Sequence, residues 1–299
     1  MPGPVVVGLD GSRESLAAAR WAAREATARR SPLLLLHSWT SQPLNAPIAQ
    51  EGHNKQLYGR EVLDAAAAEL TRLHPGLSVS TELVADPAAK ALLDHAEDAG
   101  MLVVGSRGHG AVVGFLLGSV SLHVIGAAGC PVVTVRAGAA AGAHGAAPVP
   151  VPGDDDVLGN EDGAITVGLS AHGPAAHALL DFAFASAEPD GTPVRVVRSL
   201  PLTTLLPGPS GEPGRFEAQE REALAGELAA WREKFPTVPL TEHVETGTAA
   251  QVLLAAAAHS RLVVVGKRRH SAPFGGRLGP VAHAALHHLP CPVAVVPHD

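Results

Sequence analysis

The sequence predicts an α/β protein of two consecutive doubly wound domains, each built on a parallel sheet of about five strands. Short apolar runs alternate with longer segments whose apolar residues recur at helical spacing, which is typical of parallel α/β sheets. The 299 residues are enough for two domains of ordinary size. Segments of the first half also return about 160 residues later, which indicates a tandem duplication.

The first half of the chain has the pattern of five strands and four helices. Residues 33–36 are four leucines after a proline, as expected of a central parallel strand. Ser12 precedes an alanine-rich segment and can cap the helix that begins there. The strands are expected at 5–8, 33–36, 77–84, 102–104 and 132–135, and the helices at 13–29, 56–73, 87–99 and from 119 onward.

The second half repeats the first. Residues 165–170 correspond to residues 5–10, and residues 263–266 correspond to residues 102–105. The segment between the copies contains small residues, spaced prolines and an acidic run without apolar periodicity, which is typical of a semi-flexible linker. We therefore expect one domain at 1–137, a linker at 138–163 and a second domain at 164–299.

Composition and charge argue against several classes of function. The formal net charge is -7 and the basic residues are scattered, which disfavours a nucleic-acid-binding surface. No apolar stretch is long enough to cross a bilayer, and the N-terminus lacks the pattern of a secretion signal. Cys130 and Cys291 each precede a proline and are expected to be buried and reduced rather than a redox pair. We expect a cytoplasmic protein that binds neither nucleic acid nor membrane.

A glycine-rich segment after the fourth expected strand has the pattern of a phosphate-binding loop. Gly105-Ser106-Arg107-Gly108 is followed, nine residues later, by Gly118-Ser119. Glycines directly after a strand let the backbone turn tightly and bring its N–H groups close to an anion. Ser119 is expected to be the N-cap of the next helix, whose positive end would face the same anion. The Walker and dinucleotide-binding patterns are both absent from this segment.

The spacing G-x2-G-x9-G-[S/T] is the nucleotide-binding pattern of the universal stress protein family, and the chain resembles that family over residues 3–136 and 164–297. The resemblance implies two Rossmann-like domains of the adenine nucleotide alpha hydrolase type, with ATP bound in the first. It places the backbone of five residues around the phosphates: Gly105, Gly108, Gly118, Ser119 and Val120.

The resemblance also implies roles for residues at the ends of the first two strands. Asp10 would contact the ribose or hold Mg²⁺ on the phosphates. Ser38 and Gly8 would lie beside the adenine. Arg107 either stabilises the triphosphate or is a solvated loop charge, and we weigh the two alternatives equally.

The second copy departs from the pattern at three positions. Ser170 replaces Asp10, Arg269 replaces the second glycine, and Pro280 replaces Ser119. Each change removes a contact: a carboxylate, a glycine-only conformation, or a hydroxyl with a backbone N–H. We therefore expect the second copy not to bind ATP in the manner of the family.

The leading hypothesis is an ATP-binding sensor or regulatory module that signals to a protein partner. We find no activating base and no trans-acting arginine for phosphoryl transfer, so the protein is expected not to be an efficient enzyme. The alternatives are a nucleotide-independent interaction protein, a slow ATPase, and a metal-binding protein that uses His283 and His287, which are four residues apart on the last helix. The resemblance further implies that the last strands of the two copies pair as an internal pseudo-dimer, with homodimerisation left open.

Overall fold

The computed structural model describes residues 3–40, 51–106, 118–137, 163–170, 173–201, 213–269 and 278–299. The chain divides into two compact units, one formed mainly by its first half and the other mainly by its second half. Each unit contains a five-stranded parallel arrangement with helices on both faces, so the predicted α/β class is confirmed.

The elements of the first unit alternate strand and helix as predicted. They are β1 (Val5–Leu9), α1 (Arg13–Arg29), β2 (Leu33–Ser38), α2 (Glu51–Leu73), β3 (Val79–Val84), α3 (Ala88–His95), β4 (Met101–Ser106), α4 (Ser119–Ala127) and β5 (Val132–Arg136). The strand order is β3-β2-β1-β4-β5, and each described pair of neighbours is parallel. β1 therefore lies between β2 and β4.

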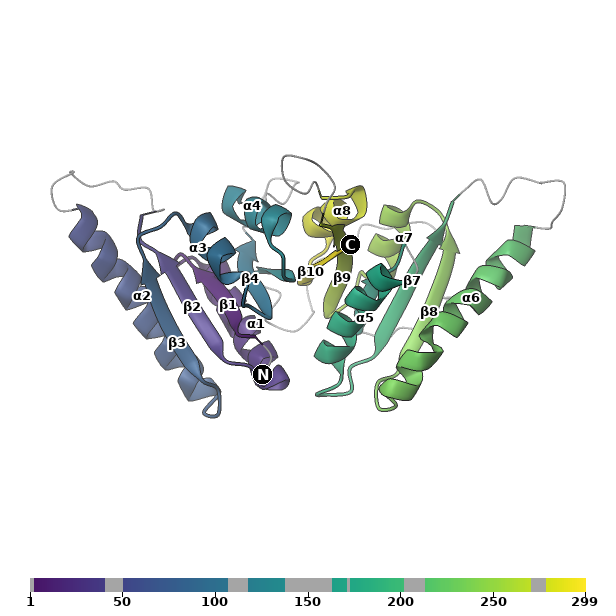
Figure 1. The fold of residues 1–299 in the computed structure, drawn as a ribbon, viewed down its shortest axis with the longest axis horizontal. Coiled ribbons are helices and arrows are strands. Elements are labelled where there is room, and N and C mark those ends of the chain that lie inside the picture. Colours follow the sequence, from purple (N-terminus) through teal and green to yellow (C-terminus); the bar gives the residue numbers. More distant parts are fainter. Residues whose placement is uncertain are drawn as a thin grey trace. The chain divides into compact units, whose positions relative to one another are not determined.

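Helices cover both faces of the first sheet (Figure 1). α1 packs on β1, β4 and β5, and α2 packs on β2 and β3 beside it. α3 lies against β1 and β2 and contacts α4, which covers β4 and β5. Because the strands are covered on both sides, their residues form near-continuous buried apolar runs, as in the fully buried Val5, Val6 and Val7. The direction of the helices changes between β1 and β4, which makes the carboxyl ends of these strands a topological switch point.

Two expected boundaries near the glycine-rich segment were wrong. β4 does not stop at residue 104, because Gly105 and Ser106 continue the ladder opposite Val135 and Arg136 of β5. The N-cap of α4 is Gly118 rather than Ser119, because the Gly118 carbonyl accepts the first helical hydrogen bond, from the Leu122 N–H at 3.0 Å. Ser119 is therefore the first helical residue.

The second unit repeats this arrangement. Its elements are β6 (Ile165–Gly168), α5 (Pro174–Ala187), β7 (Val194–Leu200), α6 (Pro213–Lys234), β8 (Leu240–Thr246), α7 (Ala249–Ala256), β9 (Leu262–Arg268), α8 (Pro280–His288) and β10 (Val293–His298). The strand order is β10-β9-β6-β7-β8, again parallel. Three stacked aromatic rings, those of Phe184, Trp231 and Phe235, join α5 to the end of α6.

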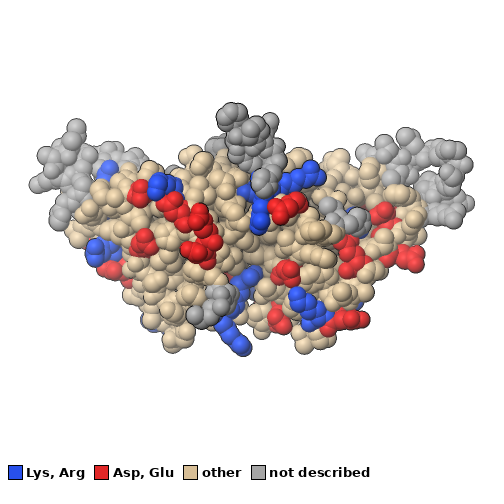
Figure 2. Space-filling model, viewed as in Figure 1, with Lys and Arg blue, Asp and Glu red and all other residues tan. Residues whose placement is uncertain are grey.

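The distribution of surface charges and the burial of the cysteines are as expected from the sequence. Figure 2 shows Lys and Arg side chains interspersed with Asp and Glu on one face, and Lys90, for example, lies 2.7 Å from Asp94. No helix in the described ranges is long and apolar enough to cross a membrane. Cys130 and Cys291 are both buried and reduced, as predicted.

One ion pair in the first unit predicts a small pH dependence of stability. His95 Nε2 lies 3.0 Å from the Glu82 carboxylate, and His95 Nδ1 lies 2.8 Å from the Ala91 carbonyl. Burial opposes protonation of His95, but the Ala91 carbonyl and the Glu82 carboxylate outweigh it and raise its pKa above the ordinary value. The ion pair therefore stabilises the folded state fully at pH values below the unfolded-state pKa of His95, which is about 6.5. This stabilisation is lost as the pH rises through the raised folded-state pKa.

We expect the His95→Gln variant to be less stable than the wild type by about 0.5 kcal/mol at about pH 5.5, because the pair is partly exposed. The difference in unfolding free energy between the two proteins should be smaller at about pH 8.5 than at about pH 5.5. Urea denaturation at both pH values measures it, and a difference that grows with pH would contradict the assignment.

Candidate functional site

The candidate site of the first unit lies at the carboxyl ends of β1, β2 and β4. β1 pairs with β2 on one side and with β4 on the other, so Gly8, Ser38 and Gly105 lie near the carboxyl ends of adjacent strands. The first turn of α4 lies beside the same edge, because the Ser121 hydroxyl donates to the Gly105 carbonyl at 3.3 Å. The structure thus brings the predicted residues of β1, β2, β4 and α4 to one edge of the sheet, and Arg107 and Gly108 lie outside the described residues.

Asp10 is exposed at the mouth of this site and is held by a turn that its own side chain stabilises. Its Oδ1 accepts hydrogen bonds from the backbone N–H of Ser12 at 2.9 Å and from the Ser12 hydroxyl. Ser12 is the N-cap of α1, as predicted, and its hydroxyl oxygen accepts the Ser15 N–H at 3.2 Å. The carboxylate is therefore pre-oriented at a solvent-facing position, and carboxylate oxygen is a ligand that Mg²⁺ prefers.

Gly105 packs closely against a helix, and its predicted contact with phosphate stays a prediction. It lies inside β4, against the first turn of α1. A Cβ at Gly105 would lie 2.7 Å from the Glu14 carbonyl carbon and 2.7 Å from the Ser15 nitrogen. The glycine therefore permits close packing of helix and strand, and this packing holds Asp10 and the cap of α1 beside the end of β4.

Gly8 and Ser38 end strands that the first unit covers on both sides. A Cβ at Gly8 would lie 3.2 Å from the Leu92 side chain of α3, which is tight but concerns a flexible neighbour. Ser38 is buried, and its hydroxyl donates to the Asp86 carbonyl at 2.6 Å. Any contact of Ser38 with a bound base would thus come from its backbone, as the family resemblance implied.

The first turn of α4 supplies the helix end that was predicted to hold phosphate. Gly118 has φ -62 and ψ 151, a conformation open to every residue, and no side chain of the described residues caps the helix. Among the described residues, nothing lies within 4 Å of the position of a Cβ on Gly118. The N–H groups of this turn lie at the positive end of the helix dipole. Val120, in the same turn, is exposed.

Two residues near Asp10 were missed by the sequence analysis. His37, in β2, is 1% exposed, and neither of its ring nitrogens has a hydrogen bond of normal geometry in the described ranges. Burial lowers the pKa of His37, against the opposing effects of the Leu9 backbone and the Asp10 charge, so the ring is neutral at pH 7. The ring of Tyr58, from α2, lies edge-on at 6.2 Å, and its hydroxyl occupies the space beside Gly11, which has φ +81.

One cue in the sequence could have drawn attention to His37. It is a polar residue directly after four leucines, in a strand predicted to be buried. No local pattern connects it to Tyr58, which is on a helix that follows a separate loop.

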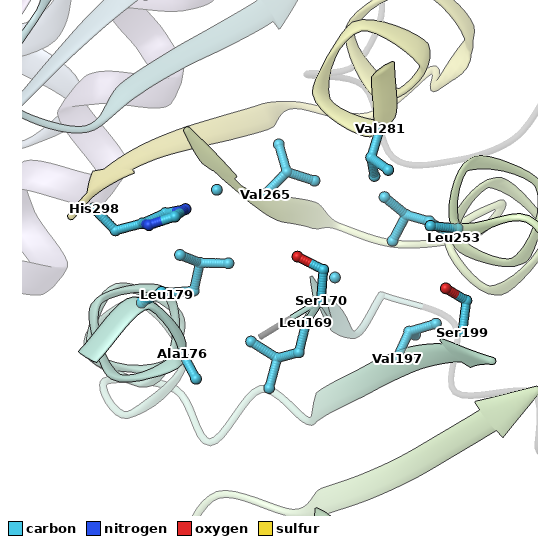
Figure 3. A pocket seen from close by; sticks show the side chains of 14 residues that line it. Leu169, Ser170, Ala176, Leu179, Val197, Ser199, Leu253, Val265, Val281 and His298 are labelled. Carbon is cyan, nitrogen blue, oxygen red and sulfur yellow. The ribbon is translucent and has the colours of Figure 1, made fainter. Parts of the chain in front are cut away.

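The equivalent edge of the second unit contains a cavity of about 80 Å³ that is open to solvent (Figure 3). It lies at the carboxyl ends of β6, β7 and β9, between the starts of α5, α7 and α8. Its lining is Gly168, Leu169, Ser170, Ala175, Ala176, Leu179, Val197, Ser199, Ala249, Leu253, Val265, Gly266, Val281 and His298. Pro280 is the first residue of α8, after the N-cap Gly279, so the predicted loss of an N–H in that turn is confirmed.

Comparison with known proteins assigns both halves of the chain to one family. The model of the universal stress protein family matches residues 1–136 and 164–297. The chain belongs to this family. A universal stress protein of Mycobacterium tuberculosis is 31% identical over 300 residues, which cover 97% of this chain and 96% of the relative.

Solved structures of universal stress proteins share the fold. One from Archaeoglobus fulgidus matches with a TM-score of 0.71 at 16% identity and covers 98% of each chain. Another from Archaeoglobus fulgidus, in complex with dAMP, covers 44% of this chain and 97% of its own, with 24% identity and a TM-score of 0.34.

The histidines of the last helix do not form a metal site in the part of the chain that the structure describes. The rings of His283 and His287 lie 4.3 Å apart between centroids, tilted by 32°. Within the described ranges, no group of three or more His, Cys, Asp or Glu side chains is arranged to hold a metal ion. The two rings pack on each other on the surface of α8.

Proposed function

We propose that the first unit of this universal stress protein binds ATP as a regulatory module and does not hydrolyse it efficiently. The observation that carries the proposal is the hydrogen bond from Ser121 to the Gly105 carbonyl. This bond sets the uncapped first turn of α4 beside the carboxyl end of β4, next to the strand that ends at Asp10. The N-terminus of α4 and the oriented carboxylate of Asp10 then belong to the same topological switch point, where α/β sheets bind their ligands.

Each part of the nucleotide has a matching feature in the first unit. The phosphates would be held by the N–H groups of Ser119 and Val120, together with Gly108 and Arg107 of the preceding segment. Mg²⁺ on the phosphates, or the ribose hydroxyls, would be bound by the exposed carboxylate of Asp10. The base would lie against the end of β2, where Ser38 offers its backbone.

The same residues favour binding over hydrolysis. Asp10 accepts two hydrogen bonds from Ser12, which occupy its Oδ1 and hold the carboxylate in the turn before α1. His37 is neutral but almost completely buried, so it is poorly placed to activate a water molecule on the γ-phosphate. We infer a protein that changes state when its nucleotide is bound or released and that signals this to a protein partner in the cytoplasm.

A direct test is to denature freshly purified protein and to identify and count the nucleotide that is released. We expect about one ATP per chain, because only the first unit combines the free helix N-terminus with the carboxylate. Two ATP per chain would show that Ser170 and Pro280 do not prevent binding in the second unit. No released nucleotide, and no binding of added ATP by calorimetry, would contradict the proposal and favour a nucleotide-independent interaction protein.

A further inference from the structure

We propose that Tyr58 is a positioning residue of the nucleotide site: it holds the turn that carries Asp10 and connects this turn to α2. The proposal rests on the proposed function, in that the ligand of Asp10 is taken to be ATP with its Mg²⁺. Tyr58 is the only tyrosine in the chain. Its response to a ligand can therefore be measured without interference from another tyrosine.

The turn before α1 is held from within by hydrogen bonds. The Asp10 carboxylate accepts the Ser12 N–H at 2.9 Å, and the Asp10 N–H donates to the Ser15 hydroxyl at 3.3 Å. Gly11, between them, has φ +81, a conformation that residues with a side chain rarely adopt. Because water competes for hydrogen bonds at an exposed position, they stabilise the turn only modestly. The order of the turn thus depends also on what packs against Gly11.

α2 supplies this packing through Tyr58. A Cβ on Gly11 would overlap the Tyr58 hydroxyl oxygen and would lie 3.1 Å from Tyr58 Cζ and 3.2 Å from a methyl carbon of Val62. Tyr58 and Val62 are four residues apart on α2 and therefore lie on the same side of the helix. The Tyr58 residue is 41% exposed. Its contact with the turn is thus at the surface, and its removal should leave the fold intact.

Gly59, the next residue of α2, sets the distance between this helix and the sheet. A Cβ on Gly59 would lie 2.6 Å from His37 Cδ2 and 2.7 Å from Leu83 Cδ1. Glycine is unfavourable inside a helix, but here it lets α2 lie directly on β2 and β3 (Figure 1). This close approach brings Tyr58 to Gly11, with the centroid of its ring 6.2 Å from that of His37.

The second copy lacks this arrangement together with the carboxylate of Asp10. The strands before and after α2 and α6 pair in the same register and are the same number of residues apart, which aligns the two helices. In this alignment Gln219 replaces Tyr58, and Glu220 replaces Gly59. Both copies form the fold, but only the copy with the carboxylate has the ring. The difference favours a role of Tyr58 at the site over a role in the fold.

A ligand of Asp10 and the contact between Tyr58 and Gly11 should stabilise each other. A turn that Tyr58 holds presents its carboxylate already oriented, so less conformational freedom is lost when the ligand binds. Because coupling between two equilibria is reciprocal, bound ATP strengthens the contact by the same factor. α2 would in this way respond to the nucleotide, as a regulatory module requires.

The test is a double-mutant cycle in which calorimetry measures the binding of ATP with Mg²⁺ to the full chain. We expect Tyr58→Ala to raise the dissociation constant about tenfold, and Tyr58→Phe, which keeps the ring against Gly11, to raise it less than about threefold. In an Asp10→Asn background, Tyr58→Ala should change the dissociation constant less than about twofold, because the carboxylate through which Tyr58 acts is gone. Leu57→Ala, at the exposed neighbouring position of α2, is the control and should leave ATP binding unchanged.

A second measurement leaves the residue types of the chain unaltered. Incorporation of 3-fluorotyrosine gives one ¹⁹F resonance, because the chain has one tyrosine. We expect saturating ATP with Mg²⁺ to shift this resonance, with a midpoint equal to the dissociation constant from calorimetry. A purely structural role of Tyr58 would leave the resonance unchanged.

Three results would overturn the proposal. They are ATP binding that tolerates Tyr58→Ala, the same loss of affinity with and without the Asp10 carboxylate, and a ¹⁹F resonance that bound ATP does not move. Each of these contradicts the role of Tyr58 alone and leaves the proposed function standing. A wild-type chain that binds no ATP would contradict the proposed function and this inference together.

Discussion

Replacing Gly118 with valine is expected to abolish ATP binding while the fold is retained. The Gly118 backbone has an extended conformation that valine adopts readily, and no described residue lies near its Cβ position. The loss of a favourable N-cap residue should cost about 1 kcal/mol or less of stability. The new side chain would, however, project into the open space in front of the α4 N-terminus, where the phosphates are proposed to lie. We expect the dissociation constant for ATP, measured by calorimetry, to rise at least about 100-fold.

Gly279 provides the matched control for this experiment. It is the N-cap of α8, with φ -65 and ψ 160, and no described residue lies within 4 Å of its Cβ position. Gly279→Val should therefore have a similarly small effect on stability and no effect on ATP binding. Loss of ATP binding in Gly279→Val but not in Gly118→Val would assign the nucleotide to the second unit. Unchanged ATP binding in Gly118→Val would show that the phosphates do not bind at the N-terminus of α4.

The largest effect on stability is expected from Gly105→Ala. The added methyl group would lie 2.7 Å from backbone atoms of Glu14 and Ser15, and backbone in the first turn of a capped helix cannot move aside as a flexible side chain can. Overpacking of this kind costs typically 1–3 kcal/mol, and we expect a value of about 3 kcal/mol here because the contact involves main chain on both sides. β4 and α1 should separate, and Asp10 should lose its position.

Urea denaturation measures the loss of stability, and hydrogen exchange of peptides from β4 and α1 shows whether it is local. Gly76→Ala is the control, because nothing lies within 4 Å of its Cβ position and Gly76 is exposed at a turn. A loss below about 1 kcal/mol for Gly105→Ala would indicate that α1 can shift at little cost. Gly105 would then not be required for packing of α1.

Local chemistry accounts for the elements that were predicted well. α1 runs from Arg13 to Arg29, as expected, because both of its ends are encoded nearby: Ser12 caps the start, and Arg30 takes a left-handed conformation with φ 53 at the end. The apolar runs of β1 and β2 required burial on two faces, which a doubly wound sheet provides. The alternation of strands and helices predicted parallel sheets, and the structure gave the order of their strands.

The two wrong boundaries, the end of β4 and the N-cap of α4, have a common origin. Whether Gly105 ends a strand or continues it depends on Val135, thirty residues further along the chain, and on the approach of α1. Gly118 and Ser119 are both acceptable N-cap residues, and in the structure, where α4 packs against β4, the N-cap is Gly118. A local pattern does not contain these long-range contacts.

The sequence by itself determined the fold class, the duplication and the positions at which each copy keeps or loses the family pattern. These are properties of residue type and spacing, and burial and helix capping turn them directly into strands and helices. The tertiary structure alone decided what each residue does. It brought Tyr58 beside His37 and Gly11, it packed Gly105 against the first turn of α1, and it left a cavity at the carboxyl ends of β6, β7 and β9. Those outcomes depend on which surfaces meet when the chain closes, because side chains distant in sequence compete for the same space.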